Sequence, residues 1–219
     1  MMSRSFLLSS IWALVLTAFG CTSQVDDGYR GEPLAKVSGT VETDGTTIAP
    51  ASVAAALVWA QARFGIGSQQ LESLRWLAES TPVTGQFPAK FTLNIYQPPP
   101  AEALIACPSS TAHIAAAFVV AFDGAADLSA PDFQKALVGR AAKYLLFYVD
   151  SDQAAGWSCF PDLGFTLTTP AKGYHLMQVV PNSTQPRAGG AVYPAYHEAP
   201  SGLATEVAIT IGLTALPSP

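Results

Sequence analysis

The stretch FPAKFTLNIY, residues 87–96, decides the fold class of this chain. Apolar residues stand at every odd position from 87 to 95, and Pro, Lys, Thr, Asn and Tyr stand at the positions between and after them. A strict period of two places the apolar side chains on one face of a β-strand and leaves the other face in water. The prolines at 98–100 end the pattern, so we predict one half-buried strand here.

Similar patterns extend outward in both directions. Further strands are predicted at residues 37–41, 53–59, 114–122, 144–149, 163–169, 174–180 and 206–213. The segments 114–122 and 144–149 are apolar on both faces, which is typical of central strands. Residues 71–78 fit either a helix or a strand, and short helices are predicted at 101–105 and 132–142.

Turns rich in Gly, Pro, Asp and Ser separate these segments. The pattern predicts an all-β fold, a mostly antiparallel β-sandwich of about 8–9 strands with one or two short helices. A hydrophobic content of 49% against 12% charged residues is sufficient for a buried core. Residues 181–202 are rich in Pro, Gly and Tyr and are predicted to form a long irregular excursion.

The N-terminus carries a secretory signal. Arg4 precedes an apolar stretch at residues 6–19 and the small residue Gly20, which is the order of regions in a signal peptide. The segment LTAFGC, residues 16–21, resembles a bacterial lipobox, and this resemblance implies cleavage before Cys21 and a diacylglyceryl group on its thiol. The fifteen residues 6–20 fall short of the roughly 20 needed to span a bilayer. An uncleaved anchor and plain secretion with a free Cys21 are the alternatives.

The predicted organisation has three parts: a signal peptide at 1–20, a lipidated Cys21 with a flexible tether at 21–35, and a β-sandwich domain at 36–216. Thr22 follows the cysteine, and the resemblance to Gram-negative lipoproteins implies a lipid anchor in the outer membrane, with the domain facing the periplasm or the cell surface. A net charge of −5 without a Lys/Arg cluster argues against nucleic-acid binding. No cofactor is predicted.

The three cysteines are Cys21, Cys107 and Cys159. An odd number in an exported protein needs an explanation, and lipidation of Cys21 supplies one. Cys107 and Cys159 are then predicted to form a disulfide, with two buried thiols as the alternative. A metal site is disfavoured because neither cysteine has a second Cys or a His at ligand spacing.

Aromatic residues in loops are the candidate contact site. Trp157, Tyr193, Tyr196 and His197 lie in two segments without clear periodicity, and exposed rings in loops bind sugars, peptides or proteins. The alternative is that these rings cover one end of the sandwich.

Asp123 and Asp127 are the candidate metal ligands. A calcium loop of the EF-hand type needs oxygen ligands at alternate positions and a glycine at the sixth, but this chain has Ala125 and Leu128 there. A solvated turn is therefore the alternative. The histidines at 113, 175 and 197 have no catalytic or metal-ligand spacing, so they are interpreted as structural or exposed, and no catalytic residue is predicted.

Several motifs together carry a resemblance. YRGEPL at 29–34, FPAKFTL at 87–93 and YLLFYVD at 144–150 resemble the pattern of a group of uncharacterised bacterial outer-membrane lipoproteins, over about residues 29–150. The opening strands are also similar to the prealbumin-like β-sandwich modules of surface proteins. The resemblance favours a strand at 71–78 and implies no chemistry.

These observations predict a membrane-anchored envelope lipoprotein that acts as a binding or accessory module, with an envelope protein or a glycan as partner. One alternative is an envelope hydrolase or calcium-dependent enzyme that uses loop carboxylates, in which Asp123, Asp127, Asp150 and Asp152, or a His with a carboxylate, converge in one pocket. A purely structural lipoprotein is the other. The sequence does not decide whether the chain is an enzyme, and it favours a protein without catalytic activity.

Overall fold

The computed structural model describes residues 30–65, 68–107, 110–154, 157, 159, 165–166, 171–186 and 192–214. The predicted signal peptide and most of the predicted tether lie outside these residues. No helix in the described part of the chain is long and apolar enough to cross a membrane.

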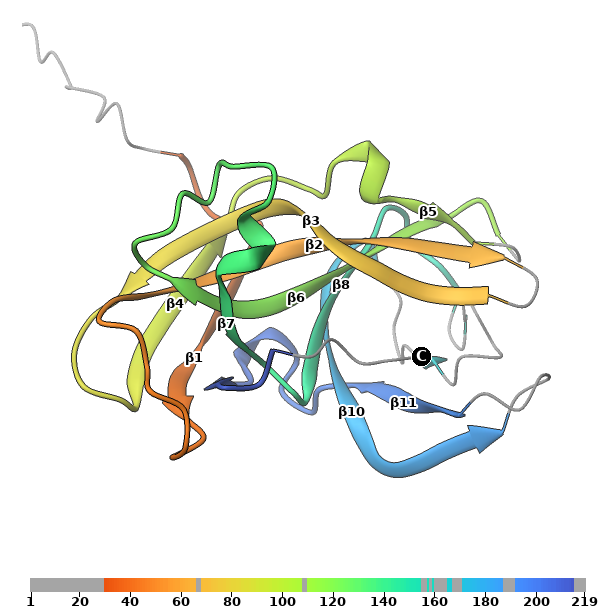
Figure 1. The fold of residues 1–219 in the computed structure, drawn as a ribbon. Coiled ribbons are helices and arrows are strands. Elements are labelled where there is room, and N and C mark those ends of the chain that lie inside the picture. The colour runs from red at the N-terminus through yellow and green to blue at the C-terminus, as the bar shows by residue number, and fades with distance from the viewer. Residues whose placement is uncertain are drawn as a thin grey trace, which may run out of the picture. The chain divides into compact units, whose positions relative to one another are not determined.

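The described residues fold into strands joined by short 3-10 helices (Figure 1). The strands are β1 Ala35–Thr43, β2 Val53–Gly65, β3 Ser68–Val83, β4 Ala89–Ile95, β5 Ile105–Ala106, β6 His113–Asp123, β7 Leu137–Arg140, β8 Tyr144–Val149, β9 Phe165–Thr166, β10 Gly173–Pro186, β11 Val192–Glu198 and β12 Val207–Ile211. The 3-10 helices are η1 Ala101–Ala103, η2 Phe133–Ala136 and η4 Gly202–Ala204.

All twelve strands belong to one mixed sheet in the order β4-β1-β12-β7-β6-β8-β10-β11-β9, with β2 and β5 also paired to β6, and β3 paired to β2. Among the described residues only the β1–β12 and β9–β11 pairings are parallel. The prediction of an all-β, mostly antiparallel fold is therefore confirmed. The strands that sequence analysis did not predict are β5, β7 and β11.

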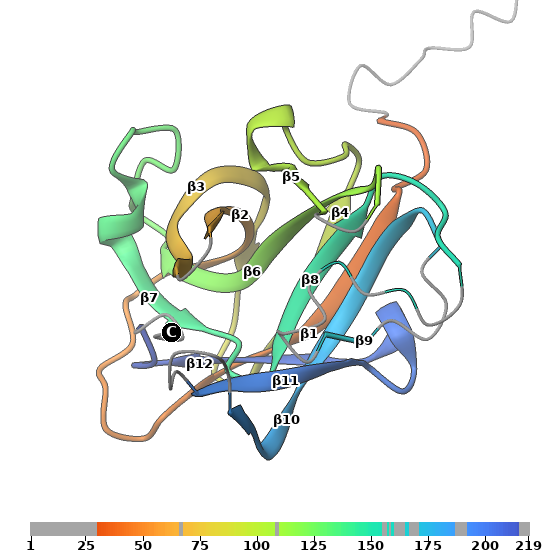
Figure 2. The same ribbon diagram turned by 90° about the vertical axis from the view of Figure 1, so that its right-hand side faces the viewer.

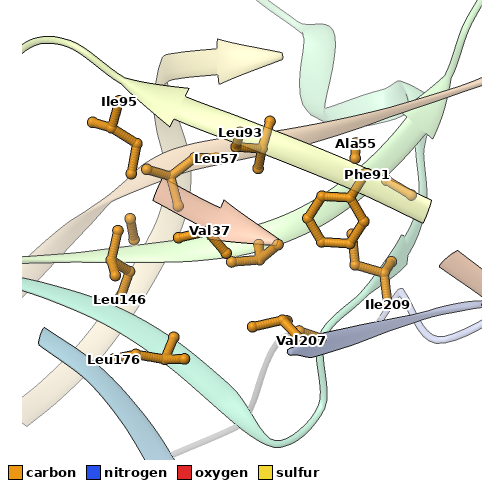
Figure 3. Close-up of a cluster of buried hydrophobic side chains, with 14 of the residues drawn as sticks. Val37, Ala55, Leu57, Phe91, Leu93, Ile95, Leu146, Leu176, Val207 and Ile209 are labelled. Carbon is orange, nitrogen blue, oxygen red and sulfur yellow. The ribbon is translucent and has the colours of Figure 1, made fainter. Parts of the chain in front are cut away.

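The sheet folds over so that β4, β1 and β12 face β2, β6, β8 and β10 across a first core cluster (Figure 3). Its members include Val37, Val41, Leu57, Trp59, Phe91, Leu93, Ile95, Leu146, Tyr148, Leu176, Val207, Ile209 and Ile211. The predicted alternation of residues 87–96 is observed from Ala89 to Ile95, where every second side chain is buried. Burial of these side chains is the main favourable term in folding.

A second core cluster lies on the other face of β6 and β8. Its larger members are Val58, Leu74, Ile114, Phe118, Val120, Phe122, Phe133, Leu145, Phe147, Val149 and Met177. Successive side chains of β6 point alternately to the two clusters. The prediction that residues 114–122 and 144–149 are apolar on both faces because they are central is therefore correct.

The hairpin formed by β2 and β3 twists strongly (Figure 2). Its register shifts between Leu57 and Val58, between Trp59 and Ala60, and between Gln61 and Ala62. Each such bulge increases the local right-handed twist, which accounts for the curl. The segment 71–78, whose sequence fits either a helix or a strand, lies within β3.

Residues 181–202 were predicted as an irregular excursion, and this prediction was wrong for most of the segment. Strands β10 and β11 pair as an antiparallel hairpin with a register shift between Val179 and Thr184. Prolines are tolerated at sheet edges and bulges, where their missing N–H breaks no ladder hydrogen bond. The Pro- and Gly-rich composition therefore did not indicate the hairpin, because its strands are defined by their pairing and not by an alternating sequence pattern.

The helices predicted at 101–105 and 132–142 are each reduced to one short 3-10 helix. The η1 helix is followed by β5, and η2 is followed by β7. Ile105 and Leu137 have β partners on β6, so pairing with the central strand replaces the last part of each predicted helix.

Gly39 is the point of closest approach between the parallel strands β1 and β12. It pairs in register with Val207, and a Cβ atom at Gly39 would overlap the backbone carbonyl of Val207. Only glycine fits, because the obstructing atoms are backbone and cannot rotate away.

We therefore predict that Gly39→Ala lowers the free energy of unfolding by at least about 3 kcal/mol, the upper range for overpacking a core. Urea denaturation of the purified protein measures the change. The matched control is Gly45→Ala, because Gly45 has a φ of +79° and no neighbouring atom within 4 Å, so that only its left-handed backbone costs about 1 kcal/mol. Equal losses in the two variants would contradict this account of the β1–β12 contact.

Candidate functional site

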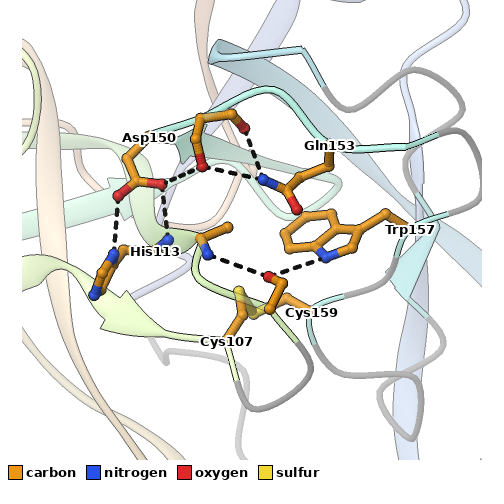
Figure 4. The surroundings of a disulfide bond; sticks show 9 residues. Cys107, His113, Asp150, Gln153, Trp157 and Cys159 are labelled. Carbon is orange, nitrogen blue, oxygen red and sulfur yellow. Dashed lines mark hydrogen bonds and ion pairs between the residues drawn. A yellow bond between two sulfur atoms is a disulfide. The ribbon is translucent and has the colours of Figure 1, made fainter.

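A disulfide joins Cys107 and Cys159, which are 52 positions apart in the chain (Figure 4). This confirms the predicted pairing. Both cysteines are buried in the second core cluster. The bond ties the segment after β5 to the loop that follows β8, so two segments far apart in the sequence share one corner of the domain.

Side-chain hydrogen bonds order this corner further. Trp157 Nε1 donates to Ser110 Oγ at 3.2 Å, and the same oxygen accepts the backbone N–H of Ala112 at 3.2 Å. Gln153 Nε2 donates to Ser151 Oγ at 3.0 Å. The Trp157 ring is half-buried and packs against the second core cluster, so one edge of an aromatic side chain stays accessible at the corner.

His113 and Asp150 form a dyad at the same corner (Figure 4). His113 Nδ1 lies 2.9 Å from Asp150 Oδ2, and the backbone N–H of His113 donates to Asp150 Oδ1 at 2.8 Å. Ser151 Oγ donates to that oxygen at 3.0 Å. Partial burial raises the pKa of Asp150, but the hydrogen bonds from His113 and Ser151, with the charge of His113, outweigh it and lower the pKa below its usual value.

The dyad orients the imidazole for chemistry at its other nitrogen. A carboxylate that holds Nδ1 fixes the tautomer and makes Nε2 a better base or metal ligand. The His113 side chain is 45% exposed, so solvent reaches the ring. Sequence analysis missed this pair because its members are 37 positions apart and meet only through the β6–β8 register, in which Ile114 pairs with Val149.

His175 is a structural residue, as its position within a strand indicated. It is buried, and Nε2 donates to the carbonyl oxygen of Ala171 at 2.8 Å while Nδ1 lies 3.2 Å from Glu198 Oε1. Both ring nitrogens are engaged, so this histidine ties β10 to β11.

The four residues of the predicted contact site have different surroundings. Tyr196 is partly buried and packs against the second core cluster, as Trp157 does. Its burial raises the pKa of the phenol, and the nearby charge of Arg140 offsets part of that rise. His197 is exposed. Tyr193 belongs to β11, and its side chain lies outside the described residues, so binding by this set stays a prediction.

Asp123 and Asp127 are engaged within their own turn. Asp123 Oδ1 accepts the N–H of Ala125 at 3.0 Å, and Asp127 Oδ1 accepts the N–H of Ser129 at 2.9 Å and its hydroxyl at 2.6 Å. The hydrogen bonds from Ser129 lower the pKa of Asp127. This geometry is that of two Asx-type turns.

Asp123 and Asp127 are far from the other pair of aspartates. Asp123 ends the 11-residue strand β6 that His113 begins, and a strand of that length spans roughly 35 Å. Asp150 and Asp152 lie at the His113 end, so the four carboxylates do not converge. In the described part of the chain, no group of three or more His, Cys, Asp or Glu residues is arranged to hold a metal ion.

A loop that sequence analysis did not single out carries an exposed apolar side chain. Ile48 is 95% exposed, and Leu34, the other large exposed apolar residue among those described, is 57% exposed. The Ile48 loop is ordered at its start by Asp44, whose carboxylate accepts the N–H groups of Thr47 and Thr46 at 2.7 and 2.8 Å. These hydrogen bonds lower the pKa of Asp44 to about 2.

The comparisons with known proteins identified no similar protein. No protein-family model matches the chain, and neither the curated proteins nor the solved structures contain a match.

We predict that replacing both cysteines, Cys107→Ser with Cys159→Ser, lowers the free energy of unfolding by about 4 kcal/mol, the chain-entropy value for a loop of this length. Replacing the pair avoids a lone reactive thiol. Urea denaturation under oxidising conditions measures the loss. Adding a reductant should bring the wild type toward the double variant and leave the double variant unchanged, and a wild type that reduction does not affect would contradict the prediction.

We also predict that the His113–Asp150 dyad contributes about 1 kcal/mol of coupling at pH 6, as expected for a partly exposed charge-assisted hydrogen bond. The pKa of Asp150 is lowered on folding, so this contribution is present above the unfolded pKa of about 3.9 and is lost as pH falls through the folded value. Unfolding of Asp150→Asn, His113→Gln and the double variant at pH 6 and at pH 2.5 measures it. A coupling that is the same at both pH values would exclude an electrostatic origin.

Proposed function

We propose that this chain is a membrane-anchored envelope lipoprotein whose β domain is a binding or accessory module for an envelope protein or a glycan. The observation that carries the proposal is the Cys107–Cys159 disulfide. It accounts for two of the three cysteines and leaves Cys21, at the end of the signal sequence, as the single thiol available for lipidation.

The location follows from the signal and the anchor together. Disulfides persist in oxidising compartments, which agrees with export of the chain. The polar segment after Cys21 contains Gly28, Gly31 and Pro33, a composition suited to a flexible tether. With Thr22 after the lipidated cysteine, we place the protein in the outer membrane, with its domain facing the periplasm or the cell surface.

The domain offers contact residues at its surface. The exposed Ile48 lies in a loop that Asp44 orders, and an ordered apolar side chain contacts a partner at a low entropic cost. Trp157 at the disulfide corner and His197 on β11 supply further groups of the kind that recognise proteins and glycans. A module built from such peripheral contacts needs no catalytic residue.

An envelope hydrolase is the second candidate, and the His113–Asp150 dyad is the observation that favours it. A hydrolase of the serine type also needs a hydroxyl beside the free ring nitrogen. The hydroxyl of Ser110 at this corner instead accepts hydrogen bonds from Trp157 and Ala112. In the described part of the chain, no contact joins the His113–Asp150 dyad to a hydroxyl that would complete a catalytic triad.

We predict that Cys21→Ser abolishes lipidation, because the thiol is the attachment point, so that the variant lacks the lipid mass that the wild type carries. Expression in a Gram-negative host followed by intact-mass measurement and membrane fractionation tests this. The matched control is the Cys107→Ser/Cys159→Ser double variant, which should keep the lipid mass. A wild-type protein that is membrane-bound without the lipid mass and with its signal sequence uncleaved would overturn the proposal in favour of an uncleaved anchor.

In-cell crosslinking of the lipidated protein, with recovered partners identified by mass spectrometry, tests the accessory role. A partner recovered near stoichiometry, and lost with Ile48→Asp or Trp157→Ala, supports the proposal and locates the contact. Recovery of no partner above background would contradict the role as a protein-binding module and would direct attention to glycans and to the hydrolase candidate.

A further inference from the structure

Arg140 occupies an unusual position for a cation. It is the last residue of β7 and pairs with Val120 on β6 and with Thr210 on β12. Directly paired residues in an antiparallel sheet point to the same face. Since Val120 is buried in the second core cluster, the Arg140 side chain lies on the face of the sheet that this cluster covers.

The guanidinium group of Arg140 has few hydrogen-bond partners among the described residues. Its Nε atom is buried and has no hydrogen-bond partner in the described part of the chain. Nη1 donates only a long bond of 3.5 Å to the carbonyl of the adjacent residue Ala141, at the limit of useful geometry. Burial lowers the pKa of Arg140, and Tyr196 offsets part of that effect. Arg140 as a residue is half-buried, and a buried donor such as its Nε–H is unfavourable when it has no hydrogen-bond partner.

Tyr196 brings a second recognition group to the same margin of the cluster. It comes from β11, packs against the second core cluster, and lies close enough to Arg140 for each to affect the titration of the other. Two strands that are distant in the sheet order, β7 and β11, therefore bring a cation and an aromatic ring to the second core cluster.

We propose that Arg140, flanked by Tyr196, binds an oxyanion, a carboxylate or phosphate group of the ligand that this module recognises. The Nε and Nη2 edge of a guanidinium presents two parallel N–H donors that match the two oxygens of such a group. In Arg140 this edge includes the donor that has no partner among the described residues. The inference rests on the proposed function as a binding module and names the chemistry of the ligand.

The full-length protein in a non-ionic detergent is the material for the test, and sodium phosphate and sodium acetate at matched ionic strength are the probes. In ¹⁵N-edited NMR, the Arg140 Nε–H resonance, assigned by its loss in Arg140→Lys, should shift on addition of at least one probe, whereas sodium chloride should leave it in place. A shift with acetate indicates a site for a carboxylate ligand, and a shift with phosphate indicates a site for a phosphate ligand. Absence of a shift with both anions would overturn the proposal, and a shift of the same size with chloride would do so as well.

Thermal unfolding gives an independent readout. At ten times its dissociation constant, the bound anion should raise the Tm of the wild type by about 4 °C for a domain of this size. Arg140→Met should lose this rise, and its Tm without anion should be no lower than that of the wild type, because a buried donor without a partner has been removed. Lys143→Met, which removes an exposed cation nearby in the chain, should keep the rise.

The outcomes separate this inference from the proposed function. If Arg140→Met unfolds at a much lower Tm and the wild type shows no anion effect, Arg140 is a structural residue and the anion site is excluded. The Cys21→Ser and crosslinking experiments do not depend on Arg140, so lipidation and partner capture can succeed while the anion site fails. If the wild type carries no lipid, the membrane anchor is excluded, and an anion effect in the same protein would still support the anion site.

Discussion

The burial of both faces of β6 is the constraint on which the rest of the structure depends. This strand pairs with β2, β5, β7 and β8, and its side chains point alternately into the two core clusters. Four of the side chains in its middle, at positions 115, 116, 117 and 121, are alanines, so the layers on both sides can approach closely. A polar residue in this strand would face an apolar cluster whichever way it pointed.

The register of β6 against β8 also creates a corner with several polar side chains. Pairing of Ile114 with Val149 places His113 beside Asp150 at the strand ends. The loop that follows β8 then brings Cys159 to Cys107 and Trp157 to Ser110. The packing of the core fixes the register of the two strands. That register in turn determines that His113 and Asp150, one residue beyond the Ile114–Val149 pair, meet at the strand ends.

Much of the fold could be predicted because a β-strand with one buried and one solvent-exposed face has alternating apolar and polar residues, as β4 has from Ala89 to Ile95. The β10–β11 hairpin could not be predicted, because its prolines and its register shift interrupt the alternating pattern. The disulfide was predictable by counting cysteines. The His113–Asp150 pair and the Arg140–Tyr196 pair were not, because each depends on a register or a strand curvature that joins distant segments, and neither leaves a local pattern in the sequence.

The same constraint bears on what kind of function the domain can support. Because apolar side chains fill both faces of β6, the polar side chains of this strand lie at its two ends, with His113, beside Asp150, at one end and Asp123 at the other. The dyad at one end and the Asp123 turn at the other are separated by the length of the strand, so they cannot cooperate in one reaction. The proposed role as a binding module uses this arrangement, because groups spread over the margin of a domain can contact a large partner at several points.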